Sequence, residues 1–243
     1  MNAIETQALT KRFGDTTAVD ALSLTVRQGE LFALLGVNGA GKTTTIRMLC
    51  GLLAPTSGDA LVCGHSVARE TSAVKSVIGV SPQETAVGPH LTVRENLMLM
   101  AGLHGFDRAE SRENTERMLR RLRLDEAAGK RAKTLSGGWM RRLSIAMALI
   151  GEPQVLFLDE PTLGLDVLIR RELWQVIREL RGSSTVILTT HYLEEAEALS
   201  DRIGIMARGR LTALGTAEEL KARAGAQNFE DAFIALAGEG GLQ

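Results

Sequence analysis

The order of apolar and polar residues predicts a chain in which strands alternate with helices. Short apolar runs, typical of buried strands, are followed by stretches in which apolar residues recur at helical spacing. The expected strands are 18–26, 31–35, 57–64, 76–81, 154–159, 185–189, 203–206 and 211–214, and the expected helices are 42–53, 92–103, 109–124, 167–180 and 193–200. The alternation in the second half indicates a mostly parallel sheet covered by helices, and the middle of the chain is expected to be mainly helical.

The composition limits the class of protein. The chain has 243 residues, of which 44% are hydrophobic and 23% charged, and this is enough for a globular α/β domain with a full core. Its formal net charge of -1 indicates no overall basic surface, so nucleic acid is not an expected partner. The two cysteines, Cys50 and Cys63, lack the spacing of a zinc site and are expected to be reduced thiols.

The apolar segments bear on where the protein acts. The N-terminal residues lack the basic, apolar and small-residue regions of a secretory signal, so the protein is expected to stay inside the cell. The apolar runs 31–35 and 155–158 are far shorter than the ~20 residues that a membrane-spanning helix needs. Any membrane role is therefore expected to come through a partner.

A glycine-rich loop lies between an expected strand and an expected helix. It reads GVNGAGKTT over 36–44 and matches the phosphate-binding pattern G-x-x-x-x-G-K-[ST]. Its glycines let successive backbone N–H groups and the helix N-terminus face phosphate oxygens, Lys42 adds a positive charge, and the Thr43 hydroxyl can bind Mg²⁺. The expected nucleotide contacts are Gly36, Val37, Asn38, Gly39, Ala40, Gly41, Lys42, Thr43 and Thr44.

A second segment, VLFLDE at 155–160, is an apolar strand that ends in two carboxylates. Downstream of a phosphate loop, the first acid of such a pair binds Mg²⁺ and the second orients the attacking water. Asp159 is therefore expected to hold the metal and Glu160 to be catalytic. An acidic strand end in isolation is commonly only solvated, and a phosphate loop fits kinases, GTPases, helicases and many ATPases, so a further landmark is needed.

That landmark is LSGG at 135–138, followed by WMRRLSIAMALI. Together with the phosphate loop and VLFLDEPT, it resembles the ATP-binding-cassette (ABC) ATPase family over nearly the whole chain. The resemblance implies an α/β fold of the P-loop NTPase (RecA-like) class, with a mostly parallel sheet core, an antiparallel β subdomain and a helical subdomain at about 84–150. It also implies an ATP-binding domain at 1–225 and a short C-terminal tail at 226–243.

The resemblance further implies a head-to-tail dimer that holds two ATP molecules. Each ATP lies between the phosphate loop of one subunit and Ser136, Gly137 and Gly138 of the other, where a helix N-terminus offers an anion-binding surface. The second subunit is expected to be the same chain or a similar one. Trp139 departs from the family pattern, which most often has glutamine there; activity is expected to survive, and the effect on nucleotide affinity and dimer geometry is left open.

Other residues match family landmarks in the expected order. Phe13 matches the aromatic residue that stacks on adenine, usually a tyrosine, and Gln83 matches the glutamine that contacts Mg²⁺ and the attacking water. Asp166 matches a loop that signals between the two sites, and His191 matches the histidine that contacts the γ-phosphate. The implied catalytic residues are Lys42, Glu160 and His191, and the implied Mg²⁺ contacts are Thr43, Gln83 and Asp159.

The segments LTVREN, EPTLGLDVLIRRELW and FEDAFIALAGEG look most like motor subunits of ABC-2-type exporters. That reading implies a separate transmembrane permease and a place on the inner face of the cell membrane. A soluble single-cassette ABC ATPase, acting in assembly or repair, and an importer motor subunit stay open as alternatives. A GTPase or small-molecule kinase is disfavoured, since the N-K-x-D guanine motif is absent and LSGG would be unexplained. The resemblance also implies that the membrane subunits, and not this chain, form the path of the transported substrate.

Overall fold

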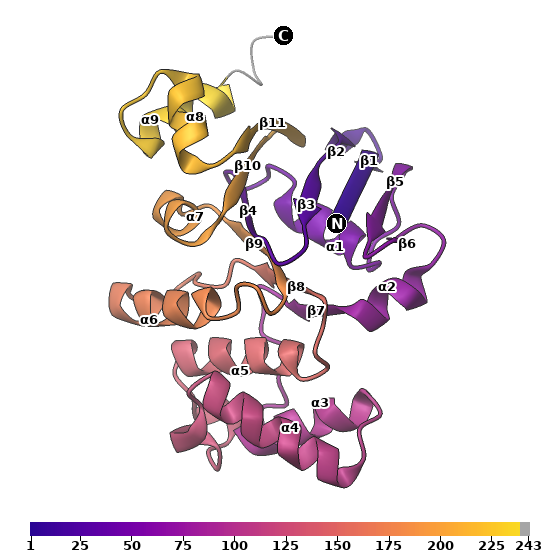
Figure 1. The fold of residues 1–243 in the computed structure, drawn as a ribbon, viewed down its shortest axis with the longest axis vertical. Helices are drawn as coiled ribbons and strands as arrows, with labels where there is room; N and C mark the ends of the chain where they lie inside the picture. Colours follow the sequence, from indigo (N-terminus) through magenta and orange to yellow (C-terminus); the bar gives the residue numbers. More distant parts are fainter. Residues whose placement is uncertain (239–243) are drawn as a thin grey trace.

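The computed structural model describes residues 1–238 and is built around a mostly parallel sheet (Figure 1). Within these residues the sheet has six strands, in the order β11 (Arg210–Gly215), β10 (Arg202–Ala207), β4 (Leu31–Leu35), β9 (Thr185–Thr190), β8 (Val155–Asp159) and β7 (Ile78–Ser81). Strands β10, β4, β9, β8 and β7 are parallel, and β11 joins β10 in antiparallel fashion. Every residue of β4, β8 and β9 is buried, as expected for parallel strands that are covered on both faces.

An antiparallel sheet packs against one face of this core. Its strands are β1 (Asn2–Phe13), β2 (Thr16–Leu22), β3 (Thr25–Arg27), β5 (Ser57–Val62) and β6 (His65–Ser66). Helices α1 (Lys42–Leu49) and α2 (Thr71–Val77) belong to the same half of the molecule. Phe32 and Phe157 of the parallel strands share a buried cluster with Ile4 and Val62 of the antiparallel sheet. The two sheets therefore enclose one hydrophobic core.

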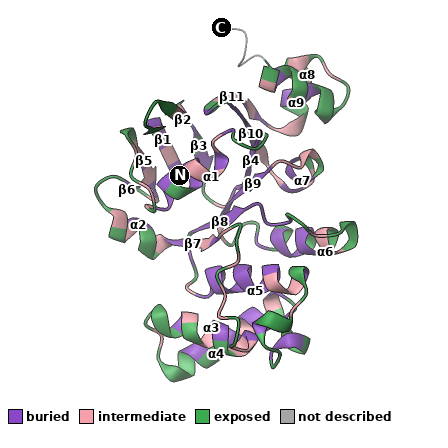
Figure 2. Cartoon of the chain, turned by 180° about the vertical axis from the view of Figure 1, so that it is seen from behind, coloured by how far each residue is buried: buried purple, intermediate pink, exposed green. Residues whose placement is uncertain are grey.

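A group of helices lies at the opposite end of the molecule from α8 and α9 (Figure 1). It comprises α3 (Val93–Leu103), α4 (Arg108–Arg121) and α5 (Gly137–Leu149), with short 3₁₀ turns at Asp125–Ala127 and Ala132–Thr134. Capping boxes fix the first turns of α3 and α4, at Thr92 with Glu95 and at Asp107 with Glu110. Figure 2 shows that α5 is largely buried, whereas the outer faces of α3 and α4 are exposed. Helix α5 thus joins the helical group to the sheet.

Helices α6 (Val167–Arg178) and α7 (Leu193–Leu199) cover the other face of the parallel sheet, and α8 (Ala217–Ala224) and α9 (Phe229–Gly238) follow β11. Helix α9 buries Phe229, Ala232 and Leu236 and packs against β10, β11 and α7. Residues 239–243 of the expected tail lie outside the described residues. Among residues 1–238, none of the helices combines the length with the apolar character that crossing a bilayer requires.

The structure differs from the predicted elements at several boundaries. The 12-residue strand β1 was not predicted, because bulges interrupt its alternation where it pairs in turn with β2, β3 and β5. The expected strand 18–26 is divided into β2 and β3. The expected strand 76–81 was wrong for its first two residues, which end helix α2. The expected helix 42–53 ends early, since Gly51 has a φ of 63°.

Candidate functional site

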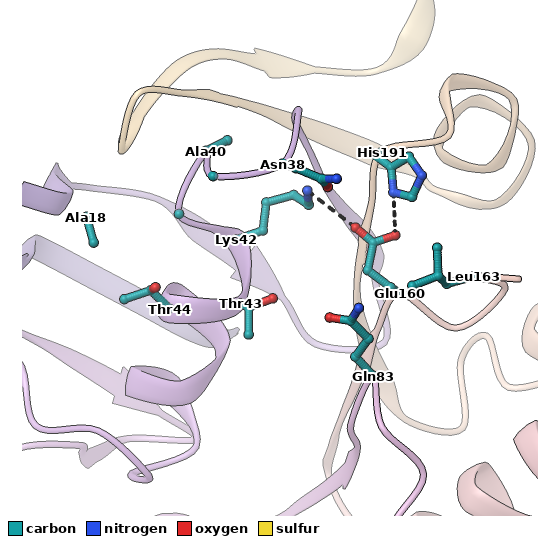
Figure 3. A pocket seen from close by; sticks show the side chains of 12 residues that line it. Ala18, Asn38, Ala40, Lys42, Thr43, Thr44, Gln83, Glu160, Leu163 and His191 are labelled. Carbon is teal, nitrogen blue, oxygen red and sulfur yellow. Dashed lines mark hydrogen bonds and ion pairs between the residues drawn. The ribbon is translucent and has the colours of Figure 1, made fainter.

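A cavity of about 550 Å³ opens between the loop after β4, the ends of β8 and β9, and the segment after β7 (Figure 3). The carboxyl ends of parallel strands meet at this edge of the sheet, the usual ligand position in α/β folds. The lining residues are Ala18, Asn38, Gly39, Ala40, Gly41, Lys42, Thr43, Thr44, Gln83, Glu160, Leu163 and His191. The cavity therefore gathers residues from five separate parts of the sequence.

The backbone of the glycine-rich loop has close contacts and a positive φ angle that only glycine tolerates at these positions. A Cβ on Gly36 would lie 2.5 Å from the carbonyl oxygen of Met206. Gly41 has a φ of 102°, and a Cβ there would lie 2.5 Å from the carbonyl oxygen of Ala18. Helix α1 begins directly afterwards, so its first N–H groups face the cavity as an anion-binding surface.

The carboxylate of Glu160 lies between two nitrogen groups (Figure 3). Its Oε1 is 3.3 Å from Nζ of Lys42, and its Oε2 is 2.9 Å from Nδ1 of His191. The Lys42 and Glu160 side chains are 6% and 7% exposed, and that of His191 is 29% exposed. A carboxylate held in this way, at the wall of a cavity, can accept a proton from a water molecule or orient it.

The backbone of Glu160 is in the left-handed region, with a φ of 49°. This conformation is uncommon for a residue with a side chain and costs on the order of 1–3 kcal/mol. The backbone N–H of Glu160 donates to the carbonyl and to the hydroxyl of Thr189, at 3.2 and 3.0 Å. These bonds hold the turn that directs the carboxylate into the cavity.

Asp159, the last residue of β8, is buried beside the phosphate loop. Its Oδ1 accepts hydrogen bonds from the hydroxyl of Thr43 at 3.1 Å and from that of Thr189 at 2.5 Å. Gln83 faces the same cavity from the segment after β7. Hydroxyl, carboxylate and amide oxygens are the ligands that Mg²⁺ prefers, so this donor set fits that ion.

Arg141, a residue that was not predicted to bear on the site, holds the segment that carries Gln83. It lies on α5, is almost fully buried, and donates to the carbonyl oxygens of Pro82 at 2.8 Å and Gln83 at 2.9 Å. Burial lowers the pKa of Arg141, and the carboxylates of Asp159, Glu195 and Glu160 oppose that shift. The local sequence does not predict the hydrogen bonds of Arg141, because they join segments that are nearly sixty residues apart.

The structure does not bring every expected residue into the cavity. Ser136 and Gly137 are exposed at the N-terminus of α5, outside the cavity, and within residues 1–238 the Ser136 hydroxyl makes no capping bond. Gly138 is buried, and a Cβ there would lie 2.3 Å from Cγ2 of Ile169. Trp139 is partly buried beneath Nζ of Lys130, which is 5.2 Å from the ring centroid. The serine-glycine tip, residues 136–138, therefore does not line the cavity formed by the chain's own phosphate loop.

Three further residues that the sequence predicted to contact nucleotide lie outside the cavity lining. Phe13 is 51% exposed at the end of β1 and, like Gly36 and Val37, is not among the residues that line the cavity. The lining instead includes Ala18 and Leu163, which sequence reasoning missed. Both are ordinary apolar residues in loops or at a strand, so nothing in their local sequence distinguishes them.

Comparisons with known proteins agree with this geometry. Residues 19–163 match the family model described as ABC transporter, and a shorter stretch, 135–195, matches one described as an AAA domain, putative AbiEii toxin, Type IV TA system. The chain is similar to the daunorubicin resistance ATP-binding protein DrrA3 of Streptomyces coeruleorubidus, at 45% identity over 94% of this chain and 72% of the relative. It is also similar to the daunorubicin/doxorubicin resistance ATP-binding protein DrrA of Streptomyces peucetius, at 46% identity over 92% and 68% of the two chains.

Solved structures give the same result. The chain resembles the ATP-binding subunit of an ABC transporter with a TM-score of 0.85 and 28% identity, covering 96% of this chain and 99% of the other. It resembles cbiO1 from Clostridium perfringens, part of the ABC transporter complex cbiONQ, with a TM-score of 0.83 and 27% identity over 91% of both chains. On the family model, the relatives and the fold together, the chain belongs to the ABC transporter family as an ATP-binding subunit that hydrolyses ATP.

Proposed function

We propose that the chain is the motor subunit of an ABC-2-type exporter, in which closure of an ATP-bound dimer drives a separate membrane permease. One observation carries the part of this proposal that concerns the ATP-bound dimer. Lys42, Glu160 and His191 converge in one cavity, whereas the exposed Ser136 tip lies outside it. The cavity holds one part of the site and the Ser136 segment the other, so the site is completed when the Ser136 segment of a second copy covers the cavity.

The chemistry proposed for the cavity is hydrolysis of the γ-phosphate of ATP. Water attacks the γ-phosphorus in line, a new P–O bond forms, and the bond to the bridging oxygen of ADP breaks. Glu160 accepts the proton that the water loses and passes it to the inorganic phosphate. His191 orients the reacting groups, and Lys42 stabilises the charge that develops on the phosphate oxygens.

The residues around Asp159 support a metal-assisted version of this reaction. Thr43, Asp159 and Gln83 would hold Mg²⁺ through oxygen atoms, and the bound ion would neutralise phosphate charge. The phosphate loop from Gly36 to Thr44 would bind the phosphates through its backbone N–H groups. Phe13 would lie against the adenine, because its aromatic ring is half-exposed at the end of a strand.

The second copy supplies the remaining contacts in this proposal. Ser136 and the amides of Gly137 and Gly138 meet the γ-phosphate bound by the facing subunit, at the N-terminus of a 13-residue helix. Asp166 caps α6 by accepting from the N–H groups of Leu168 and Ile169, which fixes the loop that lies beside the tip. ATP thereby holds the two subunits together, and hydrolysis releases them.

The exporter assignment rests on the relatives and on an exposed apolar face. Both drug-resistance relatives are ATP-binding proteins that cover most of this chain. Leu99 and Leu103 of α3 are 50% and 72% exposed, and such side chains favour contact with an apolar partner surface. We propose that a membrane permease binds there, so that the chain lies on the inner face of the cell membrane. The helical group at about 84–150 would then pass dimer closure to the permease, and 226–243 would be a short appendage.

Glu160→Gln tests the enzymatic part of the proposal. The variant should bind ATP, accumulate as a dimer in light scattering when ATP is present, and hydrolyse ATP at a small fraction of the wild-type rate. Glu113→Gln, at an exposed position on α4, is the matched control and should behave as wild type. Near-normal turnover by Glu160→Gln, or full-rate hydrolysis by monomers, would contradict this mechanism.

Co-purification tests the transport part separately. The tagged chain, isolated from detergent-solubilised membranes of its own cells, should bring down a multi-span membrane protein that mass spectrometry identifies. Recovery without such a protein, together with ATPase activity, would instead support a soluble assembly or repair factor.

A further inference from the structure

A buried carboxylate that the proposed chemistry does not use lies on α7, the helix that follows His191. The Glu195 side chain is completely buried. Its Oε1 accepts hydrogen bonds from the Thr162 hydroxyl at 2.8 Å and from Nε1 of Trp174 at 3.0 Å. Its Oε2 has no hydrogen-bond partner in the part of the chain that the structure describes. An incompletely paired acid in a protein core is unusual and calls for an explanation.

The partners of Glu195 belong to the segments that build the hydrolysis site. Thr162 lies two residues after Glu160, in the turn that leaves β8. Glu195 itself lies four residues after His191. The 2.8 Å bond therefore joins the chain segments that carry Glu160 and His191, whose side chains meet at 2.9 Å.

Side chains of helix α6 also contact the same segment. Trp174 donates to Glu195, and the guanidinium of Arg170 lies 4.3 Å from the ring centroid of Tyr192, the neighbour of His191. The first turn of α6 also contacts the serine-glycine tip, because Ile169 occupies the space beside Gly138. A shift of α7 relative to α6 would disturb both the Glu160–His191 pair and the tip.

We propose that Glu195 is a positioning residue for ATP hydrolysis: by accepting hydrogen bonds from Thr162 and Trp174, it keeps the His191 segment in register with Glu160. The inference rests on the proposed function, since it concerns the geometry of that site. It assigns to Glu195 no contact with ATP or water.

The surroundings of Glu195 disfavour its charged form, which is compatible with this role. Burial raises the pKa of Glu195, the nearby charge of Glu160 adds to the rise, and contacts from Thr190, Thr162 and Trp174 oppose it. In either protonation state, Oε1 can accept hydrogen bonds from both Thr162 and Trp174. Glutamine has the same shape and the same acceptor, so it should replace glutamate, whereas alanine removes the acceptor altogether.

Steady-state ATPase kinetics on Glu195→Ala, Glu195→Gln and the control Glu194→Ala test the proposal. Glu195→Ala should lower kcat about 10-fold or more and leave KM for ATP within about twofold, because a small misplacement of reacting groups affects the chemical step. Glu195→Gln should keep at least about half of kcat, since its amide oxygen can still accept from Thr162 and Trp174. Glu194 is the exposed preceding residue, and its variant should match wild type.

Three results would contradict a positioning role for Glu195. An unchanged kcat in folded Glu195→Ala, a rise in KM alone, or a Glu195→Gln variant as slow as the alanine variant would each overturn the proposal. If Glu195→Ala fails to fold, Thr162→Val removes one donor with little change in shape, and should lower kcat about threefold at constant KM. A wild-type chain that does not hydrolyse ATP would instead refute the proposed function, and Glu160→Gln measured in parallel keeps the two failures apart.

Discussion

The ammonium group of Lys42 lies 3.3 Å from Oε1 of Glu160, and both side chains are almost completely buried. Nζ of Lys42 also donates to the carbonyl oxygen of Gly36 at 2.7 Å. The lysine therefore joins the phosphate loop to the end of β8, in addition to any contact that it makes with phosphate. A buried carboxylate depends on such a partner, because an unpaired charge in the interior is strongly unfavourable.

Lys42→Ala should weaken ATP binding roughly 30-fold or more, since the loss of one charged contact with phosphate is worth about 2 kcal/mol. Equilibrium binding of a fluorescent ATP analogue measures the change. Lys133→Ala, at an exposed position, serves as the control and should bind as wild type. Unchanged affinity for the analogue in Lys42→Ala would count against the phosphate loop as the nucleotide site.

The same variant should also lose about 3 kcal/mol in free energy of unfolding, because Glu160 is left buried with one partner fewer. Lys42→Ala combined with Glu160→Gln should recover most of that loss, since the second change removes the uncompensated charge. Urea unfolding of the single and double variants gives the comparison. Strict additivity of the two changes would show that the pair is not coupled.

Arg141→Met should destabilise the chain by about 2–3 kcal/mol, because two carbonyl oxygens, of Pro82 and Gln83, lose a charged donor while the apolar stem is kept. Hydrogen exchange should rise in the segment after β7. Arg142→Met is the matched control, since it breaks one pair with the half-exposed Glu172, and should cost about 1 kcal/mol or less. Equal losses in the two variants, with unchanged exchange around Gln83, would contradict this account.

Part of the site follows from the sequence because its residues sit in local motifs. Lys42 lies at the fixed position of a loop that ends a strand, and Glu160 and His191 each follow another apolar strand. Parallel strands end at the same edge of a sheet, so residues at those ends are predicted to meet. The Lys42–Glu160–His191 cluster has this arrangement.

The remainder depends on contacts between segments that are distant in the sequence. Arg141 and Glu195 lie on helices whose apolar spacing predicts burial, but the carbonyls and donors that they bind come from other elements. Strand β1 was not predicted for a related reason. Its bulges depend on pairing with three other strands that are separate in the sequence. Phe13 is exposed although aromatic, and periodicity gives no signal for such a position.

The two cysteines should differ in reactivity. Burial, followed by the charge of Asp159, raises the pKa of the Cys50 thiol far above its ordinary value, and burial also raises the pKa of the partly buried Cys63. At pH 8, Ellman's reagent should therefore modify Cys63 slowly in the folded protein. It should modify Cys50 only after unfolding in urea. Cys63→Ser should show no reaction in the folded state. Rapid reaction of that variant in buffer would contradict the burial of Cys50.

Asp59 should make folding depend on acid pH. Burial alone would raise the pKa of Asp59, but hydrogen bonds from the Ser66 hydroxyl and the N–H groups of Ala60 and Ala68, with the charge of Arg69, together lower it below its ordinary value of 3.8. The Ser66 hydroxyl donates to Oδ2 at 2.6 Å. A carboxylate with a lowered pKa in the folded state stabilises the fold above its unfolded-state pKa, and this contribution is lost as pH falls through the folded-state value.

Asp59→Asn should therefore lower the free energy of unfolding by about 1–2 kcal/mol at pH 7. The difference from wild type should persist at about pH 5 and shrink between about pH 4 and pH 2, where the wild-type carboxylate takes up its proton and comes to resemble the amide. Asp15→Asn, at an exposed position in the β1–β2 turn, provides the control and should follow wild type throughout. Urea unfolding at several pH values measures the gap; a gap that stays constant to pH 2 would mean that the charge of Asp59 contributes nothing to the fold.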